Sequence, residues 1–137
     1  MPSKIRIQRI NDRIRDELAS MLVMEVADPR LNGVTVTDVR VDRELAYADV
    51  YVSAVEGHER SKEILEGLHS AVGFLRRALA DRVDLRVFPR LRFHWDPTPE
   101  RADHIERMLA ELRNEESNTS STAEEPPAAG DENQDDE

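Results

Sequence analysis

The sequence predicts an α+β domain in which a small three-stranded sheet carries its helices on one face. Apolar residues recur at steps of three and four along residues 5–26 and 61–82, which is the period of amphipathic helices. Apolar and polar residues alternate along 34–41, 46–55 and 91–95, which is the period of strands with one buried face. The predicted order is therefore helix, strand, strand, bent helix pair, strand, helix.

The first predicted helix, residues 5–26, has an apolar stripe and a partly basic outer face. The first fifteen residues contain five bases against the single acid Asp12. This face is either an ordinary solvated surface or a surface that meets RNA. The helix ends at Asp28–Gly33, because proline disfavours helix at the residue before it and Asn-Gly favours a turn.

The next two segments predict a β-hairpin. The alternation along 34–41 slips by one at Asp38, which indicates a bulge or a strand with two similar faces. Residues 42–45 form the turn. Along 46–55, small and branched residues alternate with polar and aromatic ones such as Tyr47, as expected for a strand under helices.

The segment 61–82 keeps one apolar face but contains Gly67 and Gly73. A straight helix of this length would span about 30 Å, and each interior glycine costs about 1 kcal/mol relative to alanine. We therefore predict two helices with a bend near residues 71–73. Amides at the start of a helix after Gly73 would attract anions. Alternatively, the small residues simply allow the helix to pack closely on the sheet.

The third strand, 91–95, places Leu91, Phe93 and Trp95 on the buried face. Phe93 and Trp95 are thus expected in the core, so the sheet is not expected to carry an exposed aromatic pair that stacks bases. Thr98 and Pro99 then suit the start of a last helix. Its predicted apolar stripe consists of Ile105, Met108, Leu109 and Leu112.

The charge of the chain is distributed unevenly. The 137 residues carry a net charge of -10, but nine acids and no base follow residue 113. Residues 1–113 are nearly neutral, and 76–92 hold six arginines against two acids. We predict a folded domain over 1–113 and a disordered acidic tail over 114–137, whose composition cannot bury enough apolar surface to fold. Two basic patches on a neutral body favour a polyanionic partner over a small ligand.

Enzyme and membrane signatures do not occur in the sequence. The chain has no cysteine, no apolar run long enough for a membrane span and no secretory signal. It has no glycine-rich phosphate loop. Its four histidines do not form a metal-binding spacing and are better explained as solvated or core-edge residues: His58, His69, His94 and His104.

Several short motifs, in this order, carry a family resemblance: Arg9–Asp12, Asp28–Leu31, Ala48–Ser53, Ser70–Arg76 and Pro89–Phe93. Over about residues 3–112 the sequence resembles the ribosome-binding factor A family of bacterial assembly factors. The resemblance implies a type II KH-like fold with an Ala-x-Gly kink, here residues 71–73, in place of a Gly-x-x-Gly loop. It also implies a non-enzymatic protein that binds the free small (30S) ribosomal subunit, contacts its 16S rRNA and supports late maturation and 5′-end processing.

Combining the basic patches with this resemblance gives an expected RNA-facing surface. It comprises Ala71, Val72, Gly73, Arg76, Arg77, Lys4, Arg6, Arg9 and Arg13, together with Arg82, Arg90 and Arg92. We expect a cytoplasmic monomer without cofactor, metal, membrane or small-molecule substrate. Two alternatives remain: a KH-like binder of single-stranded RNA outside the ribosome, and a protein-interaction adaptor that binds through its acidic tail.

Overall fold

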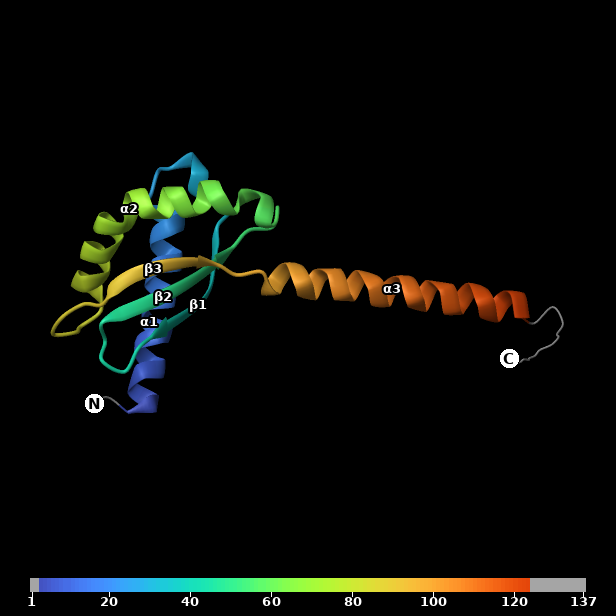
Figure 1. Ribbon diagram of the computed structural model, residues 1–137, viewed down its shortest axis with the longest axis horizontal. Coiled ribbons are helices and arrows are strands. Elements are labelled where there is room, and N and C mark those ends of the chain that lie inside the picture. Colours follow the sequence, from blue (N-terminus) through green and yellow to red (C-terminus); the bar gives the residue numbers. More distant parts are fainter. Residues whose placement is uncertain (1–2, 124–137) are drawn as a thin grey trace. The chain divides into compact units, whose positions relative to one another are not determined.

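The computed structural model describes residues 3–123, and Figure 1 shows their arrangement. The chain divides into two units, Met1–Pro97 and Thr98–Glu137. The first unit holds α1 (Lys4–Met24), η1 (Pro29–Leu31), β1 (Thr35–Val41), β2 (Tyr47–Ser53), η2 (His58–Arg60), α2 (Ser61–Arg82) and β3 (Arg90–Trp95), where η denotes a short 3-10 helix. The second contains α3 (Thr98–Ala123). The predicted α+β class is confirmed.

The sheet has the strand order β1-β2-β3. Strands β1 and β2 pair antiparallel, as the predicted hairpin requires, whereas β2 and β3 pair parallel. A parallel pair needs a long crossover, which α2 provides. The register shifts between Val36 and Asp38, so the predicted slip is a β-bulge. The Thr37 hydroxyl in this bulge lies 2.6 Å from a carboxylate oxygen of Asp96.

One face of the sheet is covered by α1 and α2. Figure 1 shows α1 crossing behind the strands. The side chains of Ala48, Val50 and Val52 in β2 are completely buried beneath the helices. They form one cluster with the inner stripes of the two helices, which include Ile14 and Leu68. The polar residues that alternate with them in β2 and β3 therefore lie on the opposite face, as the sequence pattern predicted.

Helix α2 is a single helix over its whole length, Ser61–Arg82. Figure 1 shows that its ribbon changes direction, with the second half turning toward the loop before β3. The predicted bend is therefore present, but the predicted division into two helices is wrong. Neither Gly67 nor Gly73 has a positive φ angle, so both keep helical geometry. The bend is accommodated within a continuous helix rather than by a break.

Gly67 lies where α2 crosses η1. A Cβ atom at this position would stand 2.9 Å from Cδ2 of Leu31 and 3.3 Å from Cβ of Arg30. Gly67 therefore allows a close approach of two backbones. The motif Asp28–Leu31 stabilises the other side of this contact, because the Asp28 carboxylate accepts from the Arg30 amide and guanidinium while Leu31 is buried. Arg60 adds hydrogen bonds to the same turn.

The second unit is described by α3. It begins at Thr98, as predicted, and its apolar stripe Ile105, Met108, Leu109 and Leu112 is about half exposed. The helix continues to Ala123, which includes residues 114–123 of the segment predicted as a disordered tail. Residues 124–137 lie outside the described part of the chain. The boundary at residue 113 and the disorder of 114–137 therefore stay predictions.

Candidate nucleic-acid interface

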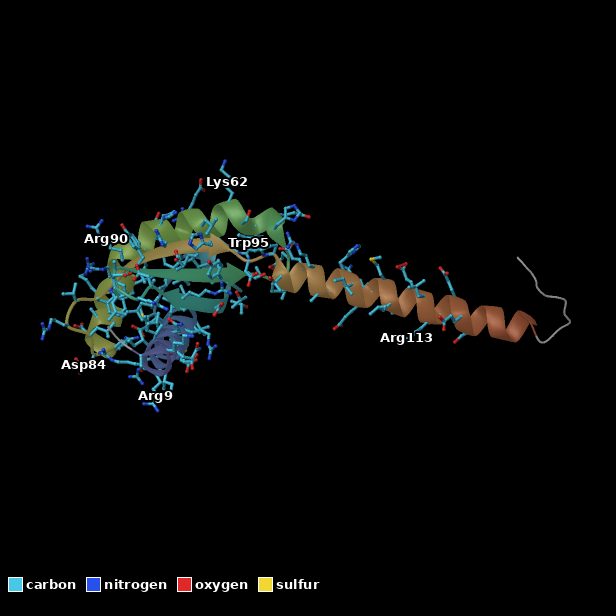
Figure 2. All side chains as sticks on the ribbon, turned by 60° about the horizontal axis from the view of Figure 1, so that its bottom comes forward. Arg9, Lys62, Asp84, Arg90, Trp95 and Arg113 are labelled. Atoms are coloured by element: carbon cyan, nitrogen blue, oxygen red, sulfur yellow. The ribbon has the colours of Figure 1, made fainter. Side chains whose placement is uncertain are left out.

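The first basic group lies on α1. Ser3 caps this helix by accepting a hydrogen bond from the Arg6 amide at 3.1 Å. The basic residues Lys4, Arg6 and Arg9 are exposed on its N-terminal turns, and Figure 2 shows Arg9 pointing away from the helix. Three exposed cations on consecutive turns can approach a phosphate chain without losing contacts of the fold.

Arg13 is also exposed, but it holds α1 and α2 together. Its Nη2 atom donates to the carbonyl of Arg82 at 3.2 Å and lies 3.5 Å from a carboxylate oxygen of Glu17. The carbonyl belongs to the last residue of α2, where helix carbonyls lack partners within the helix. The predicted RNA contact of Arg13 therefore has to coexist with this cap.

The middle of α2 presents the second group. Ala71 and Val72 are partly buried, whereas Gly73 is exposed. The sequence-based argument that a helix begins here and offers free amides to an anion is wrong, because the helix runs through this point and its amides are bonded internally. What remains is steric: a Cβ at Gly73 would meet only the tip of Arg77, at 3.4 Å, so the glycine leaves an open surface.

Phe74 completes this surface and was missed by the sequence reasoning. Its side chain is 43% exposed, between exposed Gly73 and Arg77 on the same helix face. The signal was present in the sequence, because Phe74 falls outside the apolar stripe that continues through Leu75 and Leu79. An exposed ring beside a glycine and a cation offers a base-stacking surface next to a phosphate contact.

Arg76 faces a different direction from Arg77. Its guanidinium donates to the carbonyls of Phe88 at 2.6 Å and Pro89 at 3.2 Å. These bonds hold the loop before β3 against α2. Arg77 is exposed and has no hydrogen bond or ion pair within residues 3–123. The two adjacent arginines therefore have separate environments, and Arg77 is the one whose donors are not used by other residues of the described chain.

The remaining three predicted residues lie apart from the middle of α2. Arg82 ends α2 and donates to a carboxylate oxygen of Glu25 at 2.6 Å, which lowers the pKa of Glu25. Arg90 and Arg92 lie on β3 and alternate with buried residues, so both are on the face of the sheet away from the helices. The structure does not bring these residues together with Gly73 and Arg77 in one cluster.

On that sheet face, Arg92 forms a bidentate pair with Asp49. The distances are 2.8 Å from Nε to Oδ1 and 3.0 Å from Nη2 to Oδ2. His94 Nε2 lies 2.8 Å from the same Oδ1 atom. The hydrogen bond from Arg92, followed by that from His94, holds the pKa of Asp49 below its usual range despite partial desolvation. Asp49 is therefore an ionised side chain that orients the planar groups of Arg92 and His94.

Metal chemistry has no support in the described residues, where no three His, Cys, Asp or Glu side chains converge on a common point. Within the same residues, no helix has the length and apolarity required to cross a bilayer. The candidate interface consists of exposed cations, a glycine and an exposed aromatic ring, which is a composition suited to binding a polyanion.

Known proteins resemble this chain over most of its length. Residues 6–109 match the family described as ribosome-binding factor A. A ribosome-binding factor A from Alcanivorax borkumensis is 45% identical over 112 residues, which cover 81% of this chain and 82% of the relative. One from Aromatoleum aromaticum is 40% identical over 113 residues, covering 82% of this chain and 89% of the relative.

Solved structures agree with this sequence similarity. The crystal structure of ribosome-binding factor A from Thermus thermophilus has a TM-score of 0.59 and 32% identity, covering 65% of this chain and 93% of that one. A homology model of the Thermus thermophilus factor, fitted into an electron cryo-microscopy map of a 30S complex, has a TM-score of 0.51 and 35% identity. It covers 61% of this chain and 87% of that one. The KH-like fold expected from the sequence motifs is confirmed.

Proposed function

The chain belongs to the ribosome-binding factor A family, and we propose that it binds the free 30S subunit through 16S rRNA and supports late maturation and 5′-end processing of that rRNA. The observation that carries the proposal is the similarity to a factor placed in a 30S complex, at 35% identity. The exposed cations of α1 and the open surface at Gly73 add physical support, since both suit a phosphate chain. The proposed protein is a non-enzymatic, cytoplasmic monomer.

We place the centre of the RNA contact at the exposed residues of α1 and α2. Lys4, Arg6, Arg9 and Arg77 provide cations, and the face formed by Gly73 and Phe74 allows close approach. Arg76 and Arg13 remain in the proposed set, but each already donates to backbone carbonyls. Substituting them would change the fold and the interface together, so Arg77 gives the clearer test.

Co-sedimentation with purified 30S subunits at several salt concentrations tests the proposal. Each phosphate contact contributes roughly 0.7–0.9 to the slope of log affinity against log salt. Arg77→Ala should therefore weaken binding and reduce this slope by about 1. Lys62→Ala is the matched control, because Lys62 is an exposed cation at the start of the same helix and projects from it in Figure 2.

Two results would contradict the proposal at different levels. Failure of the wild-type chain to sediment with 30S subunits at low salt would refute the function. Equal slopes for Arg77→Ala and Lys62→Ala, with wild-type binding intact, would refute the placement of the contact on α2. If short unstructured RNAs bind the chain as tightly as 30S subunits do and compete with them, the result would instead support a KH-like single-strand binder acting outside the ribosome.

A further inference from the structure

The face of the sheet opposite the helices carries aromatic rings and arginines in adjacent rows. In the register of the strands, Tyr51 stands beside His94, and Asp49 stands between Arg40 on β1 and Arg92 on β3. We call this surface the outer sheet face and define it by Arg40, Tyr47, Asp49, Tyr51, Arg92 and His94. The sequence-based expectation considered only Phe93 and Trp95, whereas the structure places exposed Tyr47 and half-buried Tyr51 on this face.

The planar groups of the outer sheet face are already stacked on one another. The rings of Tyr51 and His94 have centroids 5.1 Å apart and planes inclined by 28°. The guanidinium carbon of Arg92 lies 4.0 Å from the ring centroid of Tyr47, and that of Arg40 lies 5.4 Å from the centroid of Tyr51. Tyr51 is contacted by both His94 and Arg40, whereas the planar groups of Tyr47, Arg92 and His94 also reach the solvent. Unpaired bases stack on exposed planar groups of this kind.

Asp49 makes this arrangement rigid. It holds Arg92 through two hydrogen bonds and His94 through one, so both planar groups have fixed orientations. A free arginine would lose side-chain entropy when a base stacked on it, whereas Arg92 has already lost that freedom in the fold. The outer sheet face therefore resembles a preformed stacking platform more than a set of mobile surface charges.

Exposure and charge indicate the kind of ligand that fits. The side chains of Arg92 and His94 are 49% and 43% exposed, so they are accessible as well as ordered. The two arginines are balanced by Asp49 and by Asp38, which lies 2.9 Å from Arg40. Arg90 lies on the same side of β3 and adds a cation, but most of the positive charge of this surface is already paired with acids. Stacking on bases, rather than pairing with phosphates, is the chemistry that it offers.

We propose that the outer sheet face binds unpaired bases of single-stranded RNA by stacking on Tyr47, Tyr51, His94 and the guanidinium of Arg92. The inference rests on the proposed function in that the partner is RNA, but it names a second surface with a different chemistry. The cations of α1 and α2 contact phosphates and give salt-dependent binding. The outer sheet face recognises exposed bases and adds affinity that changes little with salt.

The first experiment uses the wild-type chain. Fluorescence anisotropy compares a short unstructured RNA of about eight nucleotides with an abasic oligomer of the same length and charge. The intact RNA should bind at least tenfold more tightly. A 4-thiouridine version should crosslink, after irradiation, to peptides that contain β2 or β3. Equal binding of the two oligomers, or crosslinks confined to α1 and α2, would overturn the proposal.

Variants separate ring stacking from other contacts. The double substitution Tyr47→Ala with Tyr51→Ala should weaken RNA binding by roughly tenfold if one base stack is lost and by roughly a hundredfold if both are lost. The salt slope should stay the same. Tyr47→Phe with Tyr51→Phe is the matched control, because it keeps both rings and should bind like the wild type. Circular dichroism verifies that each variant is folded.

The outcomes distinguish the possible partners. Equal loss in the alanine and phenylalanine variants would assign the effect to the hydroxyl groups and refute stacking. Weaker 30S binding with unchanged RNA binding in the alanine variant would show that a protein, rather than RNA, contacts this face. Because the oligomer assay contains no subunit, its failure would leave the 30S co-sedimentation result, and hence the proposed function, unaffected.

Discussion

The two glycines of α2 should respond in opposite ways to the same substitution. Gly67→Ala introduces a Cβ atom 2.9 Å from Cδ2 and 3.2 Å from Cγ of Leu31, and 3.3 Å from Cβ of Arg30. Leu31 is buried, so the turn η1 has to move as a whole rather than swing one side chain into solvent. Gly73→Ala meets only the flexible tip of Arg77 at 3.4 Å.

The magnitudes follow from two opposing effects. Alanine stabilises a helix interior by about 1 kcal/mol relative to glycine, and this gain applies at both positions. Overpacking a well-filled contact costs about 1–3 kcal/mol, and this cost applies only at Gly67. We therefore expect Gly67→Ala to lower the free energy of unfolding by about 1 kcal/mol and Gly73→Ala to raise it by up to about 1 kcal/mol. For a domain of this size, each change shifts Tm by roughly 4–8 °C.

Urea unfolding followed by far-ultraviolet circular dichroism measures both variants, with equal m-values as the check that the comparison is valid. The mechanism has a further consequence: Leu31→Val removes part of the obstructing side chain. The double variant Gly67→Ala with Leu31→Val should lose less stability than the two single variants together. If Gly67→Ala is as stable as Gly73→Ala, the turn yields freely and the packing argument is refuted. Strict additivity of the double variant would also contradict it.

Three further substitutions test how charged side chains support the fold. Arg60→Met should lower the free energy of unfolding by about 1–3 kcal/mol, because two carbonyls around the Pro29–Leu31 turn lose their donor. An unchanged urea midpoint would contradict this. Arg76→Met should destabilise similarly through the loop before β3 and increase amide hydrogen exchange there, whereas unaltered exchange would show that its two bonds are dispensable. Asp49 has a lowered pKa, so its pair with Arg92 stabilises the fold above pH about 4 and less as the pH falls through the folded-state value. The stability difference between wild type and Asp49→Asn should shrink below pH about 4 in acid titrations, and a constant difference would refute the assignment.

Features that depend on neighbours in the sequence were predicted well. The bulge near Thr37 follows from a one-residue slip in alternation, and the hairpin follows from two alternating runs separated by a short turn. The helix stripes of α1 and α2 follow from their period of three to four residues. In each case the signal and the structure involve the same few residues, so no knowledge of distant segments was required.

The candidate site was predicted less completely because its chemistry depends on distant partners. Arg76 and Arg77 are adjacent and look alike in the sequence, but about 100° of helix rotation separates them, which turns one toward the carbonyls of Phe88 and Pro89 and the other to solvent. Likewise, the pairing of Tyr51 with His94 depends on the parallel register of β2 and β3. Alternation placed both residues on the outer face but could not place them beside each other.

Arginine content alone therefore overstates the nucleic-acid surface of this protein. A guanidinium that binds phosphate has to keep donors free in the unbound protein, whereas Arg60 uses its donors on the carbonyls of Arg30 and Asn32 and on two glutamates. The two roles leave opposite experimental signatures. Arg77→Ala should change the salt dependence of RNA binding and leave the urea midpoint within about 0.5 kcal/mol of wild type, since it is a surface substitution. Arg60→Met should shift the midpoint and leave the salt slope of the remaining folded protein unchanged. An arginine that both stabilises the fold and contacts RNA should change the urea midpoint and the salt slope together when it is substituted. We expect this result for Arg13, which is exposed on α1 and donates a hydrogen bond to the end of α2.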